Sequence, residues 1–198
     1  MISIKNNHNT VVVVVHEIYG VNDHMIDVCK RLADHNVDVL CPNLLQVDKP
    51  YNYSQESIAY TNFIENVGIE IAKNKLKPIL FDLKDKYDKV FVLGYSVGAT
   101  IAWLCSNEAV VDGVVAYYGS RIRDYVQQLP LSPTLLFFPQ IETSFDVDQL
   151  VETLSNKEHV YIRKMEGNHG FSNPYSNSYH QQSAQDSWDE TLKFFAKI

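Results

Sequence analysis

Short apolar runs recur along the chain and are separated by longer segments whose apolar residues fall at helical spacing. The first clear run, Val11 to Val15, is an uninterrupted series of valines. Such a run is typical of a strand buried on both faces of a parallel sheet, because a half-exposed strand would alternate polar and apolar residues. Similar runs predict further strands at residues 37–40, 90–93, 114–117, 134–138 and 160–163.

Helices are predicted in the segments between these strands. Asn22 is a good capping residue and precedes the first of them. Residues 54–87 are long enough for two helices, with a break expected near Gly68 or Pro78. Further helices are predicted at residues 97–107, through Val151 and Leu154, and at residues 182–197. Because strands and helices alternate over residues 1–198 without a linker, we expect a single α/β domain with a mostly parallel central sheet flanked by helices.

Composition and charge limit the partners that this chain can bind. With 198 residues, 45% of them hydrophobic, it can close one large core and is too short for two ordinary catalytic domains. The net charge of −7 argues against nucleic acid and anionic lipid as partners, since both need an excess of Lys and Arg on one face. No segment approaches the ~20 apolar residues that span a bilayer. We therefore expect no nucleic-acid or membrane partner.

The cysteines and the N-terminus indicate where the protein works. Cys29, Cys41 and Cys105 are odd in number, and each lies in an apolar stretch, as free buried thiols do in a reducing compartment. The N-terminal residues lack the basic region, apolar stretch and small-residue cleavage site of a secretory signal. A cytoplasmic protein is expected.

The most informative motif follows the predicted strand at residues 90–93. In a parallel sheet, chemistry occurs at the carboxyl ends of the strands. Here the strand leads directly into Gly94-Tyr95-Ser96-Val97-Gly98, and a helix follows at once. This is the GxSxG nucleophile elbow in its strand, turn and helix context, where the serine is strained and its neighbours must be small. We therefore predict Ser96 as a nucleophile, against the alternative of a tight turn that happens to hold a serine, and expect Tyr95 in the substrate pocket or directly behind it.

A serine hydroxyl needs a base to take its proton, and in this architecture the partners follow in the order serine, acid, histidine. His169 lies in a glycine-flanked loop after the last predicted strand, which is where the base belongs. His159 begins a strand and His180 lies in a polar stretch, so neither has the loop setting. His169 is the predicted base, and an uninvolved surface-loop histidine is the alternative.

The acid should follow the strand at residues 134–138, because it must reach the far nitrogen of the imidazole. Glu142 comes earliest in that loop and is favoured. Asp146 is the second candidate, and Asp148 is expected on the first turn of the next helix. A carboxylate that is not the acid would be a helix cap or a solvated charge.

Backbone amides should stabilise the oxyanion that develops on the carbonyl. One is the amide after the nucleophile, that of Val97, and the other is expected from the loop after the valine strand, at Ile18. Glu17 in that loop would be desolvated unless it is paired, so we expect it to be hydrogen-bonded beside the site or, alternatively, to be a partly exposed loop residue. His16 is expected to be a loop or core histidine.

Taken together, these motifs resemble the dienelactone hydrolase family over nearly the whole chain. The sequence His-Glu-Ile-Tyr-Gly at residues 16–20, the elbow at 94–98, Tyr-Tyr-Gly at 117–119 and His-Gly-Phe at 169–171 match that family in order and approximate spacing. The resemblance implies a compact, cofactor-free α/β-hydrolase without a separate lid domain. It also implies a small-molecule ester or lactone as substrate. We expect a monomer or homodimer.

The departures from that family bear on substrate. Ser96 stands where the family has cysteine, whose resting thiol interacts with the glutamate matching Glu17. Glu142 stands where the family has aspartate. Asn173 stands where the dienelactone-cleaving members carry an arginine for the ligand carboxylate, and no arginine lies between Arg31 and Arg121 to supply a second one. A small-ester or thioester hydrolase is therefore expected rather than a true dienelactonase.

Other functions are compatible with the same scaffold. A thioesterase or a peptidase could use the same residues, because fold does not fix function. A catalytically silent protein that binds a small ligand in the pocket is the alternative from outside the enzymes. A metal hydrolase is disfavoured, because the histidines show no HxxxH or HxxEH spacing.

Overall fold

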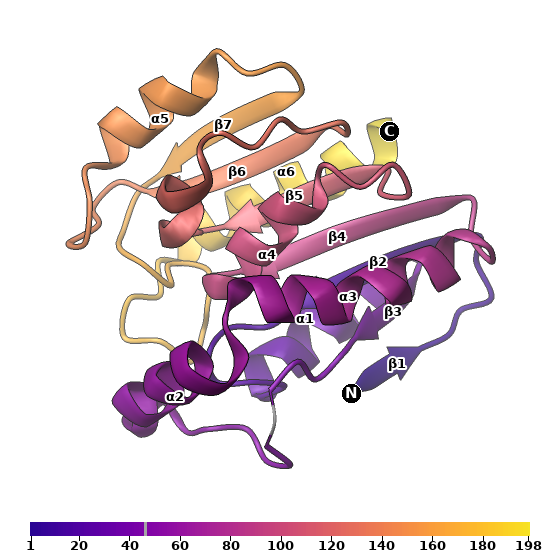
Figure 1. Cartoon of the computed structure of the whole chain (residues 1–198), viewed down its shortest axis with the longest axis horizontal. Helices are drawn as coiled ribbons and strands as arrows, with labels where there is room; N and C mark the ends of the chain where they lie inside the picture. Colours follow the sequence, from indigo (N-terminus) through magenta and orange to yellow (C-terminus); the bar gives the residue numbers. More distant parts are fainter. Residues whose placement is uncertain (46) are drawn as a thin grey trace.

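The computed structural model describes residues 1–45 and 47–198 and has a single central sheet (Figure 1). The strand order is β1-β3-β2-β4-β5-β6-β7; β1 pairs antiparallel with β3, and all the other pairs are parallel. The strands are β1 (Ile2–Ile4), β2 (Thr10–Val15), β3 (Asp38–Cys41), β4 (Lys89–Tyr95), β5 (Gly113–Tyr117), β6 (Thr134–Pro139) and β7 (Val160–Met165). The predicted strands are all present, and β1 is an additional strand.

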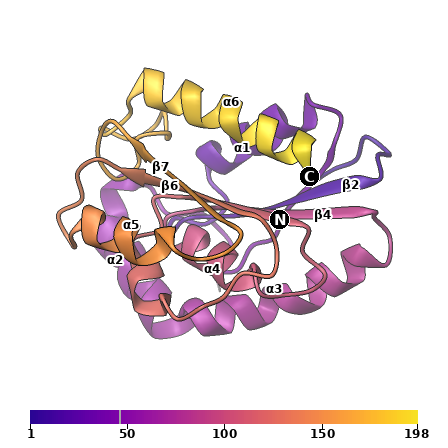
Figure 2. The same cartoon turned by 90° about the horizontal axis from the view of Figure 1, so that it is seen from above.

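Helices cover both faces of the sheet (Figure 2). One face carries α1 (Asp23–Ala33) and α6 (Gln181–Lys197). The other carries α2 (Glu56–Asn62), α3 (Ile69–Lys84), α4 (Val97–Cys105) and α5 (Val147–Ser155). Short turns complete the chain, namely η1 (Tyr53–Gln55), the π-helical η2 (Phe63–Val67) and η3 (Ser120–Tyr125). Within the described residues, no helix combines the length and the apolar character needed to cross a bilayer.

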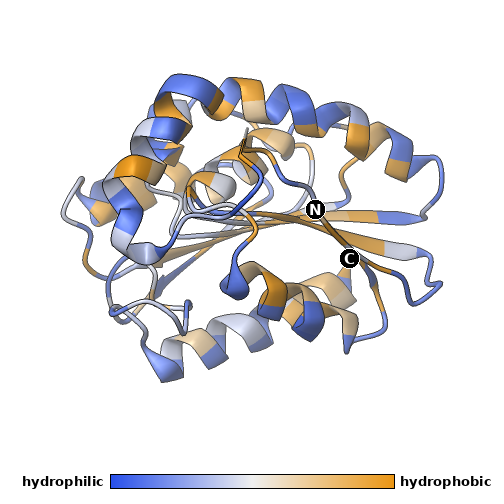
Figure 3. Cartoon of the chain, turned by 90° about the horizontal axis from the view of Figure 1, so that it is seen from below, coloured by the Kyte–Doolittle hydropathy of each residue, from blue (hydrophilic) through white to orange (hydrophobic). Residues whose placement is uncertain are grey.

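The valine run of β2 shows why the strands lack polar alternation. Val11, Val13 and Val15 pack into the core under α3 and α4, whereas Val12 and Val14 pack into the core under α1 and α6. Successive strand residues point to opposite faces, so a sheet covered on both sides needs apolar residues at every position. Figure 3 shows the hydrophobic colour along the strands and on the helix sides that face them.

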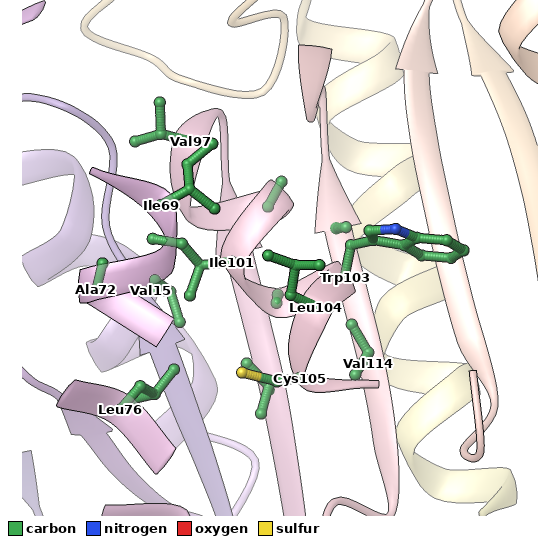
Figure 4. Close-up of a cluster of buried hydrophobic side chains, with 14 of the residues drawn as sticks. Val15, Ile69, Ala72, Leu76, Val97, Ile101, Trp103, Leu104, Cys105 and Val114 are labelled. Atoms are coloured by element: carbon green, nitrogen blue, oxygen red, sulfur yellow. The ribbon is translucent and has the colours of Figure 1, made fainter. Parts of the chain in front are cut away.

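Helix α4 has no polar face, and other elements of the fold surround it. All its residues are buried, and Ile101, Leu104 and Cys105 contribute to one core with Val15 of β2 and Leu76 of α3 (Figure 4). A helix with no polar face is stable only when other elements surround it. Its burial fixes the position of the residue at its N-terminus, Ser96.

The long helical region breaks at only one of the two expected places. Gly68 has φ of 68° and separates η2 from α3, whereas Pro78 lies inside α3. Proline removes a hydrogen bond to the carbonyl of residue 74. Pro78 and Asn74 are both exposed, so water can solvate that carbonyl, and the buried Leu76 and Leu80 hold the helix on the sheet.

Asp38, at the start of β3, attaches the N-terminal segment to the sheet. Its Oδ1 accepts hydrogen bonds from the amides of Asn6 at 2.8 Å and His8 at 3.3 Å, and its Oδ2 accepts one from the Tyr87 hydroxyl at 2.7 Å. Burial alone would raise the pKa of the Asp38 carboxyl, but these bonds and the nearby Lys5 ammonium together lower it. The folded state therefore favours ionised Asp38.

Candidate active site

Ser96 occupies a strained turn between β4 and α4. Its φ of 55° and ψ of −116° lie in a region that non-glycine residues rarely adopt. The residue is the N-cap of α4, and its amide donates to the carbonyl of Tyr117 on the neighbouring strand. The strain is held by well-packed elements on both sides, as expected of a nucleophile elbow.

The two glycines of the motif are required by close backbone contacts. A Cβ atom on Gly94 would lie 2.1 Å from the carbonyl oxygen of Gly98, and a Cβ on Gly98 would lie 2.2 Å from that of Val15. Both contacts are with backbone, which cannot move aside. The GxSxG spacing is therefore what allows α4 to start this close to β2 and β4.

His169 lies within hydrogen-bond distance of Ser96. The Ser96 Oγ is 3.0 Å from His169 Nε2, and His169 Nδ1 is 2.8 Å from Glu142 Oε2. A carboxylate can only accept, so Nδ1 carries the proton and Nε2 is free to accept the serine hydroxyl proton. The Glu142 side chain is 8% exposed and that of His169 is 36% exposed, so the contact is enclosed on the Glu142 side and open to the cleft on the His169 side.

The other carboxylates of the β6–α5 loop have different positions. Asp146 is the N-cap of α5, where its Oδ1 accepts from the amides of Asp148 and Gln149 at 2.9 and 3.1 Å. Asp148 lies in the first turn of α5 and pairs with Lys164 at 2.5 Å. Of the three candidate acids, Glu142 is the one whose carboxylate contacts His169.

Tyr118 is a residue of the site that the sequence reasoning did not single out. It is fully buried with φ of 44°, and its ring centroid lies 5.0 Å from that of His169 and 5.4 Å from that of Phe171. Its hydroxyl accepts a hydrogen bond from Ser172 at 3.2 Å. The Tyr-Tyr-Gly element at residues 117–119 was the sequence signal that could have pointed to it. Tyr118 has a left-handed backbone conformation, and its ring restricts the imidazole of His169.

His16 fixes the path of the loop after β2. The amide of Leu44 donates to His16 Nε2 at 2.9 Å, so Nδ1 carries the proton and donates to the Glu17 carbonyl at 2.7 Å. Burial lowers the pKa of the His16 imidazole, which matches this neutral form. His16 is a core histidine, and it holds the loop in which Ile18 lies.

Glu17 is a buried and paired carboxylate at the cleft, with 5% of its surface exposed. Its Oε2 accepts from Asn173 Nδ2 at 3.4 Å and lies 3.5 Å from His24 Nδ1. Burial alone would raise the pKa of the Glu17 carboxyl, but its polar neighbours, first His24 and then His169 and Tyr118, together hold that pKa below its ordinary value. Glu17 therefore remains ionised at neutral pH.

Asn173 joins Glu17 to Tyr53. Its Nδ2 also donates to the Tyr53 hydroxyl at 2.8 Å, and Asn22 donates to the same hydroxyl at 3.0 Å. Burial raises the pKa of the Tyr53 phenol to about 12, so the phenol stays neutral. Position 173 thus completes a polar network around an anionic residue and supplies no cation.

Tyr95 lies behind the site and outside the cleft. Its ring stacks on that of Tyr117 with centroids 4.8 Å apart and meets His24 edge-on at 4.9 Å. Of the two places expected for Tyr95, the structure shows the one behind the pocket, where it supports Glu17 through His24. No sequence signal pointed to His24, which lies in α1.

Ser96 and His169 open onto a cleft of about 500 Å³. Ile18 and Val97, the two expected amide donors, both line it, as do Glu17 and Asn173. Val97 is the first residue of α4, so its amide has no acceptor within the helix. Among residues 1–45 and 47–198, no cluster of three or more His, Cys, Asp or Glu side chains could hold a metal ion.

Comparisons with known proteins identify the family of this chain. The family model described as the dienelactone hydrolase family matches residues 1–198. The chain belongs to the dienelactone hydrolase family. YczH of Bacillus subtilis is 41% identical to this member over 167 residues, which cover 83% of this chain and 82% of YczH.

Solved structures similar to this dienelactone hydrolase family member have the same fold. The dienelactone hydrolase-like promiscuous phosphotriesterase P91 from metagenomic libraries has a TM-score of 0.77 at 16% identity, covering 96% of this chain and 86% of that protein. The Pyrococcus furiosus esterase Pf2001 has a TM-score of 0.69 at 18% identity, covering 98% and 85%. The chain therefore has the α/β-hydrolase fold, with a mostly parallel sheet between helices.

Proposed function

We propose that this protein is a serine hydrolase that cleaves a small carboxylic ester, thioester or lactone through an acyl-enzyme on Ser96. The observation that carries the proposal is the continuous contact from Ser96 Oγ to His169 Nε2 at 3.0 Å and from His169 Nδ1 to Glu142 Oε2 at 2.8 Å. Family membership supports hydrolytic chemistry on this fold.

The reaction takes two steps of acyl transfer. The Ser96 oxygen attacks the carbonyl carbon while His169 Nε2 takes the hydroxyl proton, and Glu142 stabilises the imidazolium that forms. The amides of Ile18 and Val97 donate to the carbonyl oxygen as it becomes negative. His169 then protonates the departing alcohol or thiol, which leaves the acyl group on Ser96. Water attacks this ester with His169 again as base, releasing the acid and restoring the serine.

The polar network beside the cleft argues against a true dienelactonase. At position 173, where the dienelactone-cleaving members carry an arginine, Asn173 binds the ionised Glu17. A substrate carboxylate placed there would meet a buried negative charge without a bidentate cation to offset it. We propose a small-molecule substrate, a cytoplasmic location, and neither nucleic acid nor membrane as a partner.

The proposal is tested by hydrolysis of a panel of para-nitrophenyl esters, acyl thioesters and short peptides. We expect turnover of short esters or thioesters and a fall in kcat/KM of at least about 10³-fold in Ser96→Ala and His169→Gln, because the triad acts as a unit. Ser155→Ala, on the exposed end of α5, is the matched control and should retain wild-type rates. Ligand-induced stabilisation without turnover of any substrate would instead favour a silent binding protein, and turnover of peptides alone a peptidase.

A further inference from the structure

A second cavity lies on the face of the sheet that α1 and α6 cover. It has a volume of about 540 Å³, within the range of ~300–1,000 Å³ that is typical of small-molecule sites. Its residues come from the starts of β2 and β4 and from the C-terminal ends of α1 and α6. Lys89 begins β4 and Ser96 follows its last residue, so at ~3.3 Å per strand residue the cavity lies about 20 Å from the nucleophile. It is therefore separate from the Ser96 cleft.

The interior of this cavity is apolar. Val12, Leu32 and Phe91 line it and are only 1–2% exposed, so they form its floor. Leu192 and Phe195 of α6 line it as half-buried side chains, and the Phe195 ring centroid lies 4.7 Å from that of Phe91. An alkyl chain placed here would leave water and cover this surface, which strengthens binding by up to about fourfold for each buried methylene.

The charged and titratable side chains of the cavity are all basic. Lys89, Lys193, His8 and His35 line it, and none of its described lining residues is an aspartate or a glutamate. The whole chain has 24 acidic residues and 17 lysines and arginines, so this local excess of basic groups runs against its overall charge. A ligand with an anionic head group matches such a rim, and a cationic one does not.

Little negative charge competes for the two lysines. Lys89 Nζ lies 3.9 Å from Asp112 Oδ1, but Asp112 already pairs with Lys84 at 2.8 Å. Within the described part of the chain, no carboxylate is close enough to form an ion pair with Lys193, and this includes the C-terminal carboxylate of Ile198, whose residue also lines the cavity. An ammonium has three donors, so both lysines keep donors for a ligand.

We infer that the cavity between α1 and α6 binds a free medium-chain aliphatic carboxylate. Its alkyl chain lies on the apolar floor, and its carboxylate is held by Lys89 and Lys193. The volume suits a single chain, and the net charge of −7 disfavours approach to an anionic bilayer, so the ligand is a free acid rather than a membrane lipid. The inference goes beyond the proposed function and does not depend on it, because this ligand is bound and not cleaved.

The test is calorimetric titration of the full chain with ligands that differ only in the head group. Octanoate, octan-1-ol and octyltrimethylammonium share one alkyl chain, and each is used below its micelle concentration. We expect octanoate to bind at least about tenfold more tightly than the other two, because it alone forms charge-assisted hydrogen bonds with the lysines. Butanoate should bind at least about tenfold more weakly than octanoate. Absence of octanoate binding, or equal affinity for the three octyl ligands, would overturn the inference.

A matched pair of charge variants separates the cavity from net charge. Lys89→Gln/Lys193→Gln should weaken octanoate binding about tenfold and change octan-1-ol binding less than about twofold. Lys73→Gln/Lys77→Gln removes the same charge from α3 on the other face of the sheet, where both lysines pair with Glu108, and should bind octanoate as the wild type does. If both double variants lose affinity equally, a general charge effect is responsible and the inference is wrong.

A third variant tests where the ligand lies. Ala196 is exposed on α6 and lines the cavity, so Ala196→Trp should fill part of it and weaken octanoate and octan-1-ol alike. Octanoate binding that this variant leaves unchanged would place the ligand elsewhere, such as in the Ser96 cleft, and would refute the inference. Sedimentation velocity distinguishes a protein occupant: a wild-type dimer that Ala196→Trp dissociates would show that a second copy covers the cavity, and the inference would again be wrong. Thermal denaturation checks the fold of each variant, and the lysine variants decide the matter if Ala196→Trp does not fold.

Discussion

The triad acid can be tested by replacing Glu142 with glutamine. The side chain keeps its size, but the Oε2 atom that lies 2.8 Å from His169 Nδ1 becomes part of a neutral amide. Glutamine cannot stabilise the imidazolium by charge, and its NH₂ group can donate to Nδ1 and so favour the wrong tautomer. Both effects act on the proton transfer from Ser96 and leave the fold in place.

The magnitude follows from the contact that is lost. A hydrogen bond to a charged group contributes about 1.5–3 kcal/mol, and the inverted tautomer adds to this loss. We expect a total of about 3–5 kcal/mol in the transition state, which corresponds to a fall in kcat of about 10²- to 4 × 10³-fold at ~1.4 kcal/mol per tenfold. KM for a short ester should change little, because the Glu142 carboxylate contacts His169 and acts on the proton transfer.

The assay is steady-state hydrolysis of para-nitrophenyl acetate by Glu142→Gln and by Asp146→Asn. Asp146 caps α5 through a side-chain oxygen that asparagine also has, so Asp146→Asn should change the unfolding free energy little and leave kcat within about twofold of wild type. Thermal denaturation of both variants checks that they fold. If Asp146→Asn abolished turnover and Glu142→Gln did not, the assignment of the acid would be wrong.

Three further predictions concern stability. The pKa of Asp38 is depressed in the folded state, so its contribution is present above the ordinary carboxyl pKa of ~3.9 and is lost as the pH falls through the folded value. Asp38→Asn should therefore lower the unfolding free energy at pH 7 and flatten its acid dependence in urea titrations; an unchanged acid limb would contradict this. Gly98→Ala forces a Cβ to 2.2 Å from the Val15 carbonyl and should lower Tm markedly or prevent folding; a wild-type Tm would show that the elbow can relax. Asn22→Ala removes the side chain that caps α1 by accepting from the Met25 amide, and it should lower the free energy of unfolding in denaturant by about 1 kcal/mol. An unchanged free energy of unfolding would show that water replaces the cap.

Most of the fold was predictable from the sequence because burial on both faces leaves a clear pattern. The valines of β2 predicted an interior strand, and the GxSxG elbow predicted the helix α4 that begins after Ser96. Strand β1 was missed because Ile2–Ile4 is too short to show a pattern and is defined by pairing with β3. Pro78 was weighed as a helix break because sequence does not reveal that Asn74 and Pro78 lie on the exposed side of α3.

The contacts of Ser96, His169 and Glu142 were predictable because loops after parallel strands meet at the carboxyl edge of a sheet. The polar network around Glu17 was not, because His24 reaches it from a helix whose rotation only packing determines.

The central claim is that the Ser96 hydroxyl is activated by His169, and labelling with a fluorophosphonate probe tests it most directly. Intact mass and peptide mapping should show one probe per chain on Ser96, no labelling of Ser96→Ala, and labelling slowed by orders of magnitude in His169→Gln. Labelling that persists at another residue in Ser96→Ala, or that proceeds at the wild-type rate without His169, would contradict the account.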